Sequence, residues 1–279
     1  MIPNILHFVF GMAADFGGKP FSLVHYLAVK SAVELNKPIA AYFHYQFEPE
    51  GEWWQKTKPL LTLNKVEAPD NFMGQSLHHV AHKADVIRLQ ALKETGGIYL
   101  DLDTITVKPF TALLNHSFAI GQELKAAYIP KNWRQRIKYA LKKKTRLVKE
   151  NNAASTGLCN AVLLSEKNSP FVNLWMEEYK TFRSKGRDKY WNEHSVLVPE
   201  KLAAQYPESI TKLSPYAFHY PLYKEDDLKM MFEEAHPFPE AYAHHLWESF
   251  SWDKYLSQLT TEKIKAEDTT YNLLARKFL

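Results

Sequence analysis

One cysteine, Cys159, stands among the 279 residues of the sequence. A lone cysteine cannot form an intrachain disulfide, which excludes a disulfide-stabilised scaffold and gives no indication of an oxidising compartment. No stretch approaches 18 consecutive apolar residues, and the first four residues lack the basic and apolar regions of a secretory signal. We therefore expect a cytoplasmic protein without a membrane span.

The sequence also lacks a linker rich in proline, glycine or serine near its middle. With 46% hydrophobic, 24% charged and 14% aromatic residues, it has the composition of a folded chain with a sizeable core. Disorder and a collagen-like repeat are excluded by the same figures. We expect one domain over residues 1–279.

Strand-like and helix-like segments alternate in the first half of the chain. Extended apolar runs occupy residues 2–10, 39–45 and 63–68, with helical patterns between them. Residues 77–94 have the clearest helical pattern, Gly96 stands where a helix C-cap is expected, and a short strand follows over residues 97–101. The alternation predicts an α/β sheet that is parallel in its first half. Residues 261–278 predict a terminal helix.

Positive charge is concentrated in one segment. The chain has a formal charge of +4, but residues 131–149 carry nine basic and no acidic side chains, so the remainder sums to −5. A nucleic-acid-binding protein more often spreads its basic residues over a whole face, so we do not expect nucleic acid as a partner. Apolar residues recur at helical spacing in the same segment, which is typical of a helix on an anionic membrane surface. A solvated helix packed on the domain and a lid that attracts an anionic glycan fit the same pattern.

Two aspartates, Asp101 and Asp103, stand one residue apart at the end of the predicted strand. Strand alternation places Tyr99 and both aspartates on one face, so two carboxylates meet at a strand end. Such a pair suits Mn²⁺ or Mg²⁺, which in a nucleotide-sugar transferase clamps the diphosphate and offsets the charge on the leaving group. The motif alone is weak, since about 0.4 Asp-x-Asp pairs are expected by chance in this composition. Its position strengthens it, because open α/β folds bind ligands at sheet ends.

Asp85 and Arg88 lie on the helix that leads into this strand. They can form an ordinary ion pair between positions i and i+3 on a helix surface. Alternatively, Arg88 offers a planar fork to phosphate oxygens, and Asp85 accepts a hydrogen bond from a sugar hydroxyl. The residues alone leave both interpretations open.

Two runs of residues resemble a known family. Residues 81–88, Ala-His-Lys-Ala-Asp-Val-Ile-Arg, and residues 96–103, Gly-Gly-Ile-Tyr-Leu-Asp-Leu-Asp, resemble the DXD sugar-binding region of glycosyltransferase family 32. Residues 2–11 resemble the first strand of that family, whose backbone and aromatic residue hold the nucleotide base. The large clostridial glucosylating toxins share the same helix-to-DXD spacing. The resemblance is strong over residues 1–125 and patchy at residues 157–162 and 245–247.

The resemblance implies a GT-A-like fold, which is an open mixed sheet flanked by helices, here with a C-terminal helical elaboration. It implies a metal-dependent, retaining hexosyltransferase that acts on a glycan or glycolipid hydroxyl, in surface polysaccharide or lipid-linked glycan synthesis. Residues 1–125 then bind the nucleotide sugar, residues 131–149 form a basic amphipathic insertion, and residues 150–279 form the acceptor-side and C-terminal portion. A UDP-sugar is the expected donor, and GDP-mannose is the alternative. Peripheral contact with the inner face of the membrane through residues 131–149 is a further expectation.

Site residues carry over from the family position by position. The resemblance implies metal ligands at Asp101, Asp103 and His245, donor contacts at Phe8, Phe10, Asp85, Arg88, Gly97, Asp101 and Trp247, and catalytic residues at Asp101, Asp103 and Asn160. Relatives commonly have tryptophan at the position of Phe10, and the weaker stacking of phenylalanine favours uridine while guanosine stays open. His245 can instead be a packed histidine in an aromatic cluster, and Asn160 a buried amide that satisfies backbone groups.

We interpret three further histidines and the single cysteine as structural residues. His78 and His82 are spaced like zinc ligands on a helix, but no glutamate completes a His-Glu-x-x-His motif, so we interpret them and His79 as capping or solvated histidines. Cys159 has no base recognisable in the sequence, and we interpret it as a small buried hydrophobe. The rival to an enzyme is a catalytically weak carbohydrate-binding protein of the same fold; the intact acidic pair and the Asp85–Arg88 pair argue against it.

Overall fold

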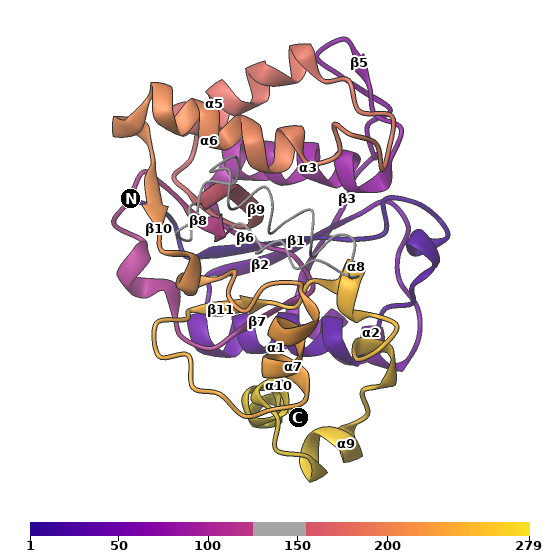
Figure 1. Ribbon diagram of the computed structural model, residues 1–279. Coiled ribbons are helices and arrows are strands. Elements are labelled where there is room, and N and C mark those ends of the chain that lie inside the picture. Colours follow the sequence, from indigo (N-terminus) through magenta and orange to yellow (C-terminus); the bar gives the residue numbers. More distant parts are fainter. Residues whose placement is uncertain (125–154) are drawn as a thin grey trace, which may run out of the picture.

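The computed structural model describes residues 1–124 and 155–279. Seven strands form one mixed sheet in the order β10-β8-β9-β6-β1-β2-β3, and two short pairs, β7-β11 and β4-β5, lie outside it (Figure 1). The strands are β1 (Ile5–Val9), β2 (Ala40–Tyr45), β3 (Thr62–Lys65), β4 (Asn71–Phe72), β5 (Gln75–Ser76), β6 (Gly97–Leu100), β7 (Thr104–Thr106), β8 (Phe118–Leu124), β9 (Ser155–Ser165), β10 (Thr211–Leu213) and β11 (Ala243–His245).

The pairing confirms the predicted fold class. β1 pairs in parallel with both β2 and β6, and β2 with β3, so the first half of the sheet is parallel as expected. β9 runs antiparallel to both β6 and β8, which makes the sheet mixed. The open mixed sheet flanked by helices is the GT-A-like architecture that the sequence predicts.

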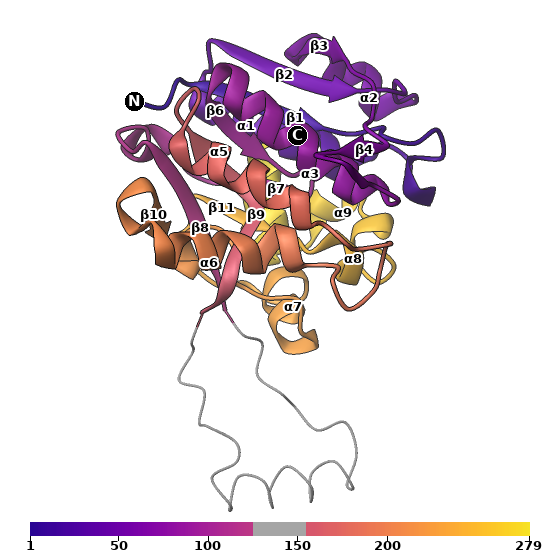
Figure 2. The same cartoon turned by 90° about the horizontal axis from the view of Figure 1, so that it is seen from above.

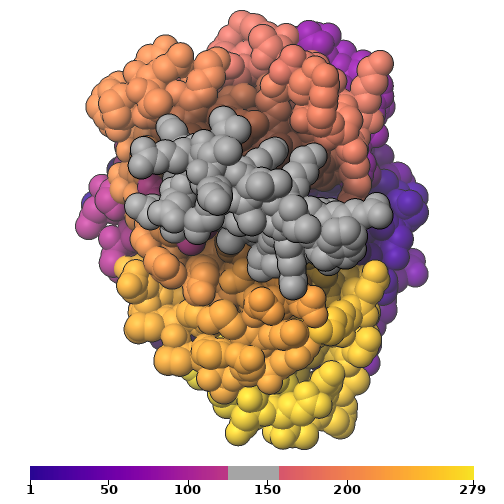
Figure 3. Space-filling view, in the orientation of Figure 1, coloured from indigo at the N-terminus to yellow at the C-terminus, as the bar shows by residue number. Residues whose placement is uncertain are grey.

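Helices cover both faces of the sheet. They are α1 (Leu23–Asn36), α2 (Glu52–Thr57), α3 (Val80–Thr95), α5 (Pro170–Glu177), α6 (Val198–Gln205), α7 (Glu225–Phe232), α8 (Glu248–Ser251), α9 (Thr261–Ala266) and α10 (Thr270–Ala275). Helices α3, α5 and α6 lie together over one face, and α1 lies over the other with α7 and α10 beyond it (Figures 1 and 2). In Figure 3, α5 and α6 form one end of the visible face and the C-terminal segments form the other.

The burial pattern follows these layers. Val86 and Leu89 of α3 pack with Trp175 of α5 in one core cluster. Val29 of α1 packs with Ile98 of β6 in a second cluster on the opposite face. A third cluster joins α1 to the C-terminal helices. Neighbouring β6 residues therefore point into different cores, as strand alternation requires.

Helix α3 begins and ends at identifiable signals. His79 is its N-cap and accepts a hydrogen bond from Ala81 N–H, so the helix starts three residues later than predicted. Gly96 is its C-cap with φ of 69°, which confirms the predicted cap. A Cβ at Gly96 would lie 2.6 Å from the Lys167 nitrogen, so only glycine fits.

Two predictions of secondary structure are wrong. The expected terminal helix over residues 261–278 breaks into α9, α10 and a final 3-10 turn (Arg276–Phe278), because Thr269 caps a new helix by accepting from Asn272 N–H. Asp103 does not lie on a strand: β6 ends at Leu100, and a tight turn follows in which Thr104 N–H donates to Asp101 O at 3.2 Å.

The basic insertion over residues 131–149 lies outside the described residues, so its predicted amphipathic helix stays a prediction. Within residues 1–124 and 155–279, none of the helices has the length and apolarity needed to cross a membrane.

Candidate active site

Asp101 and Asp103 lie beyond the end of β6 and face a histidine from the far end of the chain. Asp101 N–H still pairs with Ala161 O of β9 at 2.8 Å, which fixes the start of the turn. β11 pairs with β7 so that His245 lies opposite Thr104. One carboxylate oxygen from each aspartate and one ring nitrogen of His245 lie within 4.8 Å of one another. The turn and the β7-β11 pair thus bring together the three residues that the resemblance matched to metal ligands.

His245 and Asp103 form a close ion pair within this group. Nε2 of His245 lies 3.2 Å from Oδ2 of Asp103, and both side chains are nearly buried. The same carboxylate oxygen accepts from Glu248 N–H at 2.7 Å. Although burial alone would raise the pKa of Asp103, His245 and Glu248 N–H lower it to about 2. Burial opposes the charged form of His245, but Asp103 raises its pKa well above 6.5.

Arg88 lies at the centre of a buried network on the other side of Asp101. Its Nη1 donates to Asn160 O at 2.8 Å and lies 3.2 Å from Asp101 Oδ1, while its Nη2 lies 3.1 Å from Asp85 Oδ1. The guanidinium also lies over the Tyr99 ring at 4.4 Å. Arg88 and Asp85 do form the ion pair between positions i and i+3, but both residues are buried, so the pair does not lie on the helix surface.

The network orients its carboxylates through several donors at once. Asp85 Oδ1 also accepts from Nδ2 of Asn160 at 2.8 Å, and Asp101 Oδ1 accepts from the Tyr99 hydroxyl at 2.5 Å. Burial opposes the charge on Arg88, yet Asp101, Tyr99 and Asp85 together raise its pKa above the ordinary value. Burial raises the pKa of Asp101, and the neighbouring Asp103 adds to this. Arg88 and His245 attract the Asp101 carboxylate and oppose this rise in its pKa. Asp101 therefore lies between two basic side chains.

A small pocket lies next to this network at the start of α3. It has a volume of about 160 Å³ and is lined by residues of the loop after β1 and of the first turns of α3, namely Val9, Phe10, Gly11, Met12, Ala13, Phe16, Gly17, Val80, Ala81 and Ala84. The Phe10 ring stacks on Phe16 with centroids 5.6 Å apart and planes 9° apart. Phe10 therefore lies on the wall of a pocket whose lining on α3 ends at Ala84, the residue before Asp85.

Three of the residues expected to contact the donor are buried. The Phe8 side chain is fully buried in the core, so only the backbone of β1 could touch a donor there. Gly97 is buried at the opposite end of β6 from Asp101. A Cβ there would lie 2.6 Å from Ile5 O, so the close packing of β6 on β1 requires glycine at this position. Trp247 is also buried: its indole N–H donates to Pro221 O at 2.8 Å and its ring packs on His245 at 4.2 Å. Trp247 therefore supports His245.

Two supporting residues were not found from the sequence. Glu248 fixes Asp103 through its backbone N–H, and its side chain pairs with His25 at 3.1 Å and Lys19 at 3.0 Å. Tyr99 was placed on the correct face, but its hydrogen bond to Asp101 and its contact with Arg88 were not anticipated. No local pattern signals Glu248, because its role depends on the path of the chain after β11.

The histidines before and within α3 are structural. His79 caps the helix and packs edge-on against Trp191, and His82 is buried against Trp191 and Phe182. His78 is exposed. His79 is thus a capping histidine and His78 an exposed one, as expected, but His82 is buried, so its interpretation as a capping or solvated histidine is wrong.

Comparison with known proteins identifies relatives of the whole chain. Residues 29–119 match the family model described as the glycosyltransferase sugar-binding region containing a DXD motif. The chain is 36% identical over 285 residues to glucan organizing enzyme 1 of Cryptococcus neoformans var. grubii, and the match covers 100% of this chain and 71% of that protein.

Several solved structures are also similar. Mouse xyloside xylosyltransferase 1 matches with a TM-score of 0.49 and 13% identity, covering 90% of this chain and 99% of that one. The galactosyltransferase LgtC matches with a TM-score of 0.44 and 12% identity, covering 98% and 96%. The PaToxG glycosyltransferase matches with a TM-score of 0.43 and 17% identity, covering 74% and 69%.

Proposed function

Because the chain belongs to the glycosyltransferase family whose sugar-binding region contains a DXD motif, we propose that it transfers a hexose from a UDP-sugar to a glycan or glycolipid hydroxyl with retention of configuration. Membership of this family implies a nucleotide-sugar donor and a glycan acceptor, and enzymes of this type generally use a divalent metal. The nucleotide, the acceptor, the stereochemistry and the choice of Mn²⁺ form our proposal.

The grouping of Asp101, Asp103 and His245 is the observation that supports the proposal most strongly. Two carboxylates and one imidazole, with ligand atoms within 4.8 Å of one another, form a donor set that suits Mn²⁺ and, less well, Mg²⁺. The pairing of His245 with the Asp103 carboxylate supports a site that attracts positive charge. A divalent cation bound there supplies charge neutralisation for the donor diphosphate as it leaves.

Arg88 is proposed to act on this site as a positioning residue. Both of its terminal nitrogens are bonded to protein acceptors, so its planar fork is occupied by Asp85, Asp101 and the Asn160 carbonyl. It thereby holds Asp101 beside Asp103 and orients Asp85 toward the donor side. We assign Asp85 the acceptance of a hydrogen bond from a hydroxyl of the donor sugar, and Asn160 the alignment of Asp85 through its Nδ2.

The pocket beside α3 is the proposed site of the base. Phe10 and Phe16 present stacked aromatic rings on its wall, and Ala81 and Ala84 of α3 complete its lining near Asp85 in the sequence. A pyrimidine needs less space and less stacking area than a purine, which favours uridine over guanosine in a pocket of about 160 Å³.

For the reaction we propose attack from the face that the diphosphate leaves. The acceptor oxygen bonds to the anomeric carbon, the bond from that carbon to the diphosphate oxygen breaks, and the acceptor proton passes to the departing diphosphate. The protein positions the two reactants and stabilises the developing charge, which is the main task in such a mechanism. Asp101 and Asp103 therefore act through charge and geometry, and Asn160 through the alignment of Asp85.

The acceptor and location are proposed on other grounds. A relative named for the organisation of glucan supports a glucan as the acceptor class. We propose that the protein is cytoplasmic and contacts the inner face of the membrane through residues 131–149. The positive charge of that segment supports this location.

Thermal melting with UDP- and GDP-sugars, each with and without Mn²⁺, tests the proposal. A ligand at 100 times its Kd adds about 2.7 kcal/mol of stability, which shifts the midpoint by roughly 5 °C. We expect a Mn²⁺-dependent shift with a UDP-sugar, followed by transfer to a glucan acceptor. A melting shift with GDP-mannose alone would show that the donor is GDP-mannose and not a UDP-sugar. Melting shifts without any sugar transfer or donor hydrolysis would favour the alternative of a carbohydrate-binding protein.

A further inference from the structure

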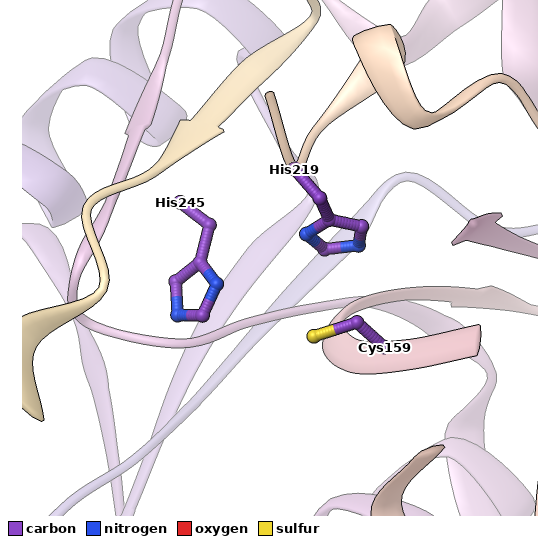
Figure 4. A group of neighbouring side chains, drawn as sticks. All are labelled: Cys159, His219 and His245. Atoms are coloured by element: carbon purple, nitrogen blue, oxygen red, sulfur yellow. The ribbon is translucent and has the colours of Figure 1, made fainter. Parts of the chain in front are cut away.

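A second group of metal-binding residue types lies beside the acidic pair. Cys159 of β9, His219 in the segment that follows the 3-10 turn Pro215–Ala217, and His245 of β11 bring one ligand atom each within 4.8 Å of the others (Figure 4). All three residues are buried. Cys159 is the single cysteine of the chain. The three side chains converge from three separate elements, so this group was not recognisable in the sequence.

The side chains of this group contact one another. His245 hydrogen-bonds with the Cys159 thiol, and His219 with the backbone of Cys159. Within the part of the chain that the structure describes, both ring nitrogens of His219 and Nδ1 of His245 are buried and have no partner outside the group. Buried imidazole nitrogens gathered around one thiol form a set of ligands that suits a borderline-soft metal ion.

The orientation of His245 fits this interpretation. Its Nε2 faces Asp103 at 3.2 Å, and its other nitrogen, Nδ1, lies on the side of His219 and Cys159 (Figure 4). Histidines that bind metals typically donate their second ring N–H to a carboxylate, which fixes the tautomer and the ring orientation. The Asp103–His245 pair has this arrangement, and Nδ1, which faces the Cys159 thiol, is the nitrogen that a metal would bind.

The surroundings hold His219 in place. Gly121 of β8 lies against the imidazole, and a Cβ there would lie 2.8 Å from His219 Cδ2 and Nε2. The exposed fraction of His219 is 0%. The Glu123 carboxylate, also on β8, hydrogen-bonds with the Cys159 thiol. The sheet therefore leaves room for the imidazole and brings a fourth potential ligand to the same place.

We propose that Cys159, His219 and His245 bind one Zn²⁺, with Glu123 as the fourth ligand. Thiolate and imidazole prefer Zn²⁺, whereas paired carboxylates prefer Mn²⁺ or Mg²⁺, so the two neighbouring groups select different metals. Tetrahedral Zn²⁺ requires ligand atoms roughly 3.5 Å apart, so the ligand atoms of Cys159, His219 and His245, which lie within 4.8 Å of one another, move closer together when the metal binds.

The two sites share His245, and this gives zinc a regulatory effect that rests on the proposed function. When Zn²⁺ occupies Nδ1, Nε2 carries the proton donated to Asp103 and is no longer a ligand for Mn²⁺. Zinc therefore weakens Mn²⁺-dependent donor binding.

Cobalt titration of the metal-free full-length protein tests the zinc site directly. Co²⁺ bound to a thiolate gives a charge-transfer absorption, and Cys159 is the single thiol that can produce it. We expect this absorption at one equivalent of Co²⁺ and its loss when one equivalent of Zn²⁺ is added. The absence of a thiolate band in the wild-type protein overturns the proposal without recourse to any variant.

Variants locate the ligands. Cys159→Ser and His219→Gln are expected to weaken Zn²⁺ binding, measured by calorimetry, by at least about 10-fold. His82→Gln is the matched control, because His82 is also buried with an unpartnered Nδ1 but lies on α3, outside this group. Equal Zn²⁺ affinity in all four proteins overturns the proposal, and metal-free melting of each variant verifies that it folds.

A competition experiment separates this inference from the proposed function. Saturating Zn²⁺ is expected to abolish the Mn²⁺-dependent melting shift produced by the nucleotide sugar in the wild-type protein and to leave it in Cys159→Ser. An undiminished shift in the zinc-loaded wild-type protein overturns the sharing of His245. Zinc binding without any donor-dependent shift would leave the zinc site standing and contradict the proposed function.

Discussion

The Asp103 carboxylate and the His245 imidazole form an ion pair, with Oδ2 and Nε2 3.2 Å apart, that joins the turn after β6 to the strand β11. Backbone pairing creates this contact: His245 lies opposite Thr104, and Leu246 N–H donates to Asp103 O at 2.7 Å. The position of the histidine beside the acidic pair is therefore fixed by the β7-β11 pair, with no cation needed to hold it there.

Asp103→Asn is expected to abolish the Mn²⁺-dependent melting shift produced by the nucleotide sugar. The amide keeps the volume of the side chain but removes the charge that attracts both His245 and a cation. The metal-free protein should still fold, with its melting temperature lowered by a few degrees because His245 loses its partner. Asp70→Asn is the control, because the Asp70 side chain is 89% exposed and remote in sequence from the motif. A normal donor shift in Asp103→Asn contradicts the assignment of the metal site.

Arg88→Lys is expected to reduce both stability and donor binding. A lysine ammonium cannot bond Asp85, Asp101 and Asn160 O together as the planar guanidinium does, so about 2–3 kcal/mol of the free energy of unfolding should be lost. Urea unfolding of the metal-free protein measures this loss. Arg183→Lys is the control and should cost less than Arg88→Lys, because the Arg183 side chain, which pairs with Glu193, is 55% exposed. Weaker donor binding with unchanged stability would show that Arg88 contacts the diphosphate directly.

Local patterns were sufficient to predict the sheet and the acidic end of the site. The apolar runs at residues 2–10 and 39–45 form parallel neighbours, and Gly96 ends α3 as predicted, since these features depend on side-chain periodicity and on one glycine. The alternation of Ile98, Tyr99 and Leu100 between two cores follows from the pleat of one strand. Asp101 keeps this pattern because its N–H still pairs with β9.

The rest depends on contacts between distant segments. The environment of Arg88 includes Asn160 from β9, so its burial could not be inferred from the helix pattern. The approach of His219 to Cys159 depends on the path of the chain after the 3-10 turn Pro215–Ala217 and on the space left by Gly121. The resemblance located His245, but the paths that bring Glu248 and His219 to it are set by tertiary packing.

Gly97→Ala is expected to destabilise the protein without altering the affinity of the folded protein for the donor. The added Cβ would lie 2.6 Å from Ile5 O in the neighbouring strand, at a φ of 119° that alanine rarely adopts. Gly186→Ala is the matched control, because Gly186 has a φ of 136° but a Cβ added there would have no other described atom within 4 Å. Urea unfolding should show a larger loss for Gly97→Ala. A weaker donor affinity, measured under conditions in which Gly97→Ala is fully folded, would show that Gly97 does contact the donor.

Stability is expected to fall as the pH decreases from about 6.5 toward 5. Burial lowers the pKa of His7 to about 4 and, with the neighbouring His7, that of His44 to about 3; burial also lowers the pKa of His244 to about 4. The unfolded chain therefore binds more protons than the folded chain in this range, and each histidine removes up to about 2 kcal/mol by pH 5. His245, whose pKa is raised, adds no loss below pH 6.5. Urea unfolding at intervals of pH measures the slope, which His244→Gln should reduce and which the exposed His236→Gln should leave unchanged. A stability that stays constant from pH 7 to 5 would contradict the burial of these imidazoles in their neutral form.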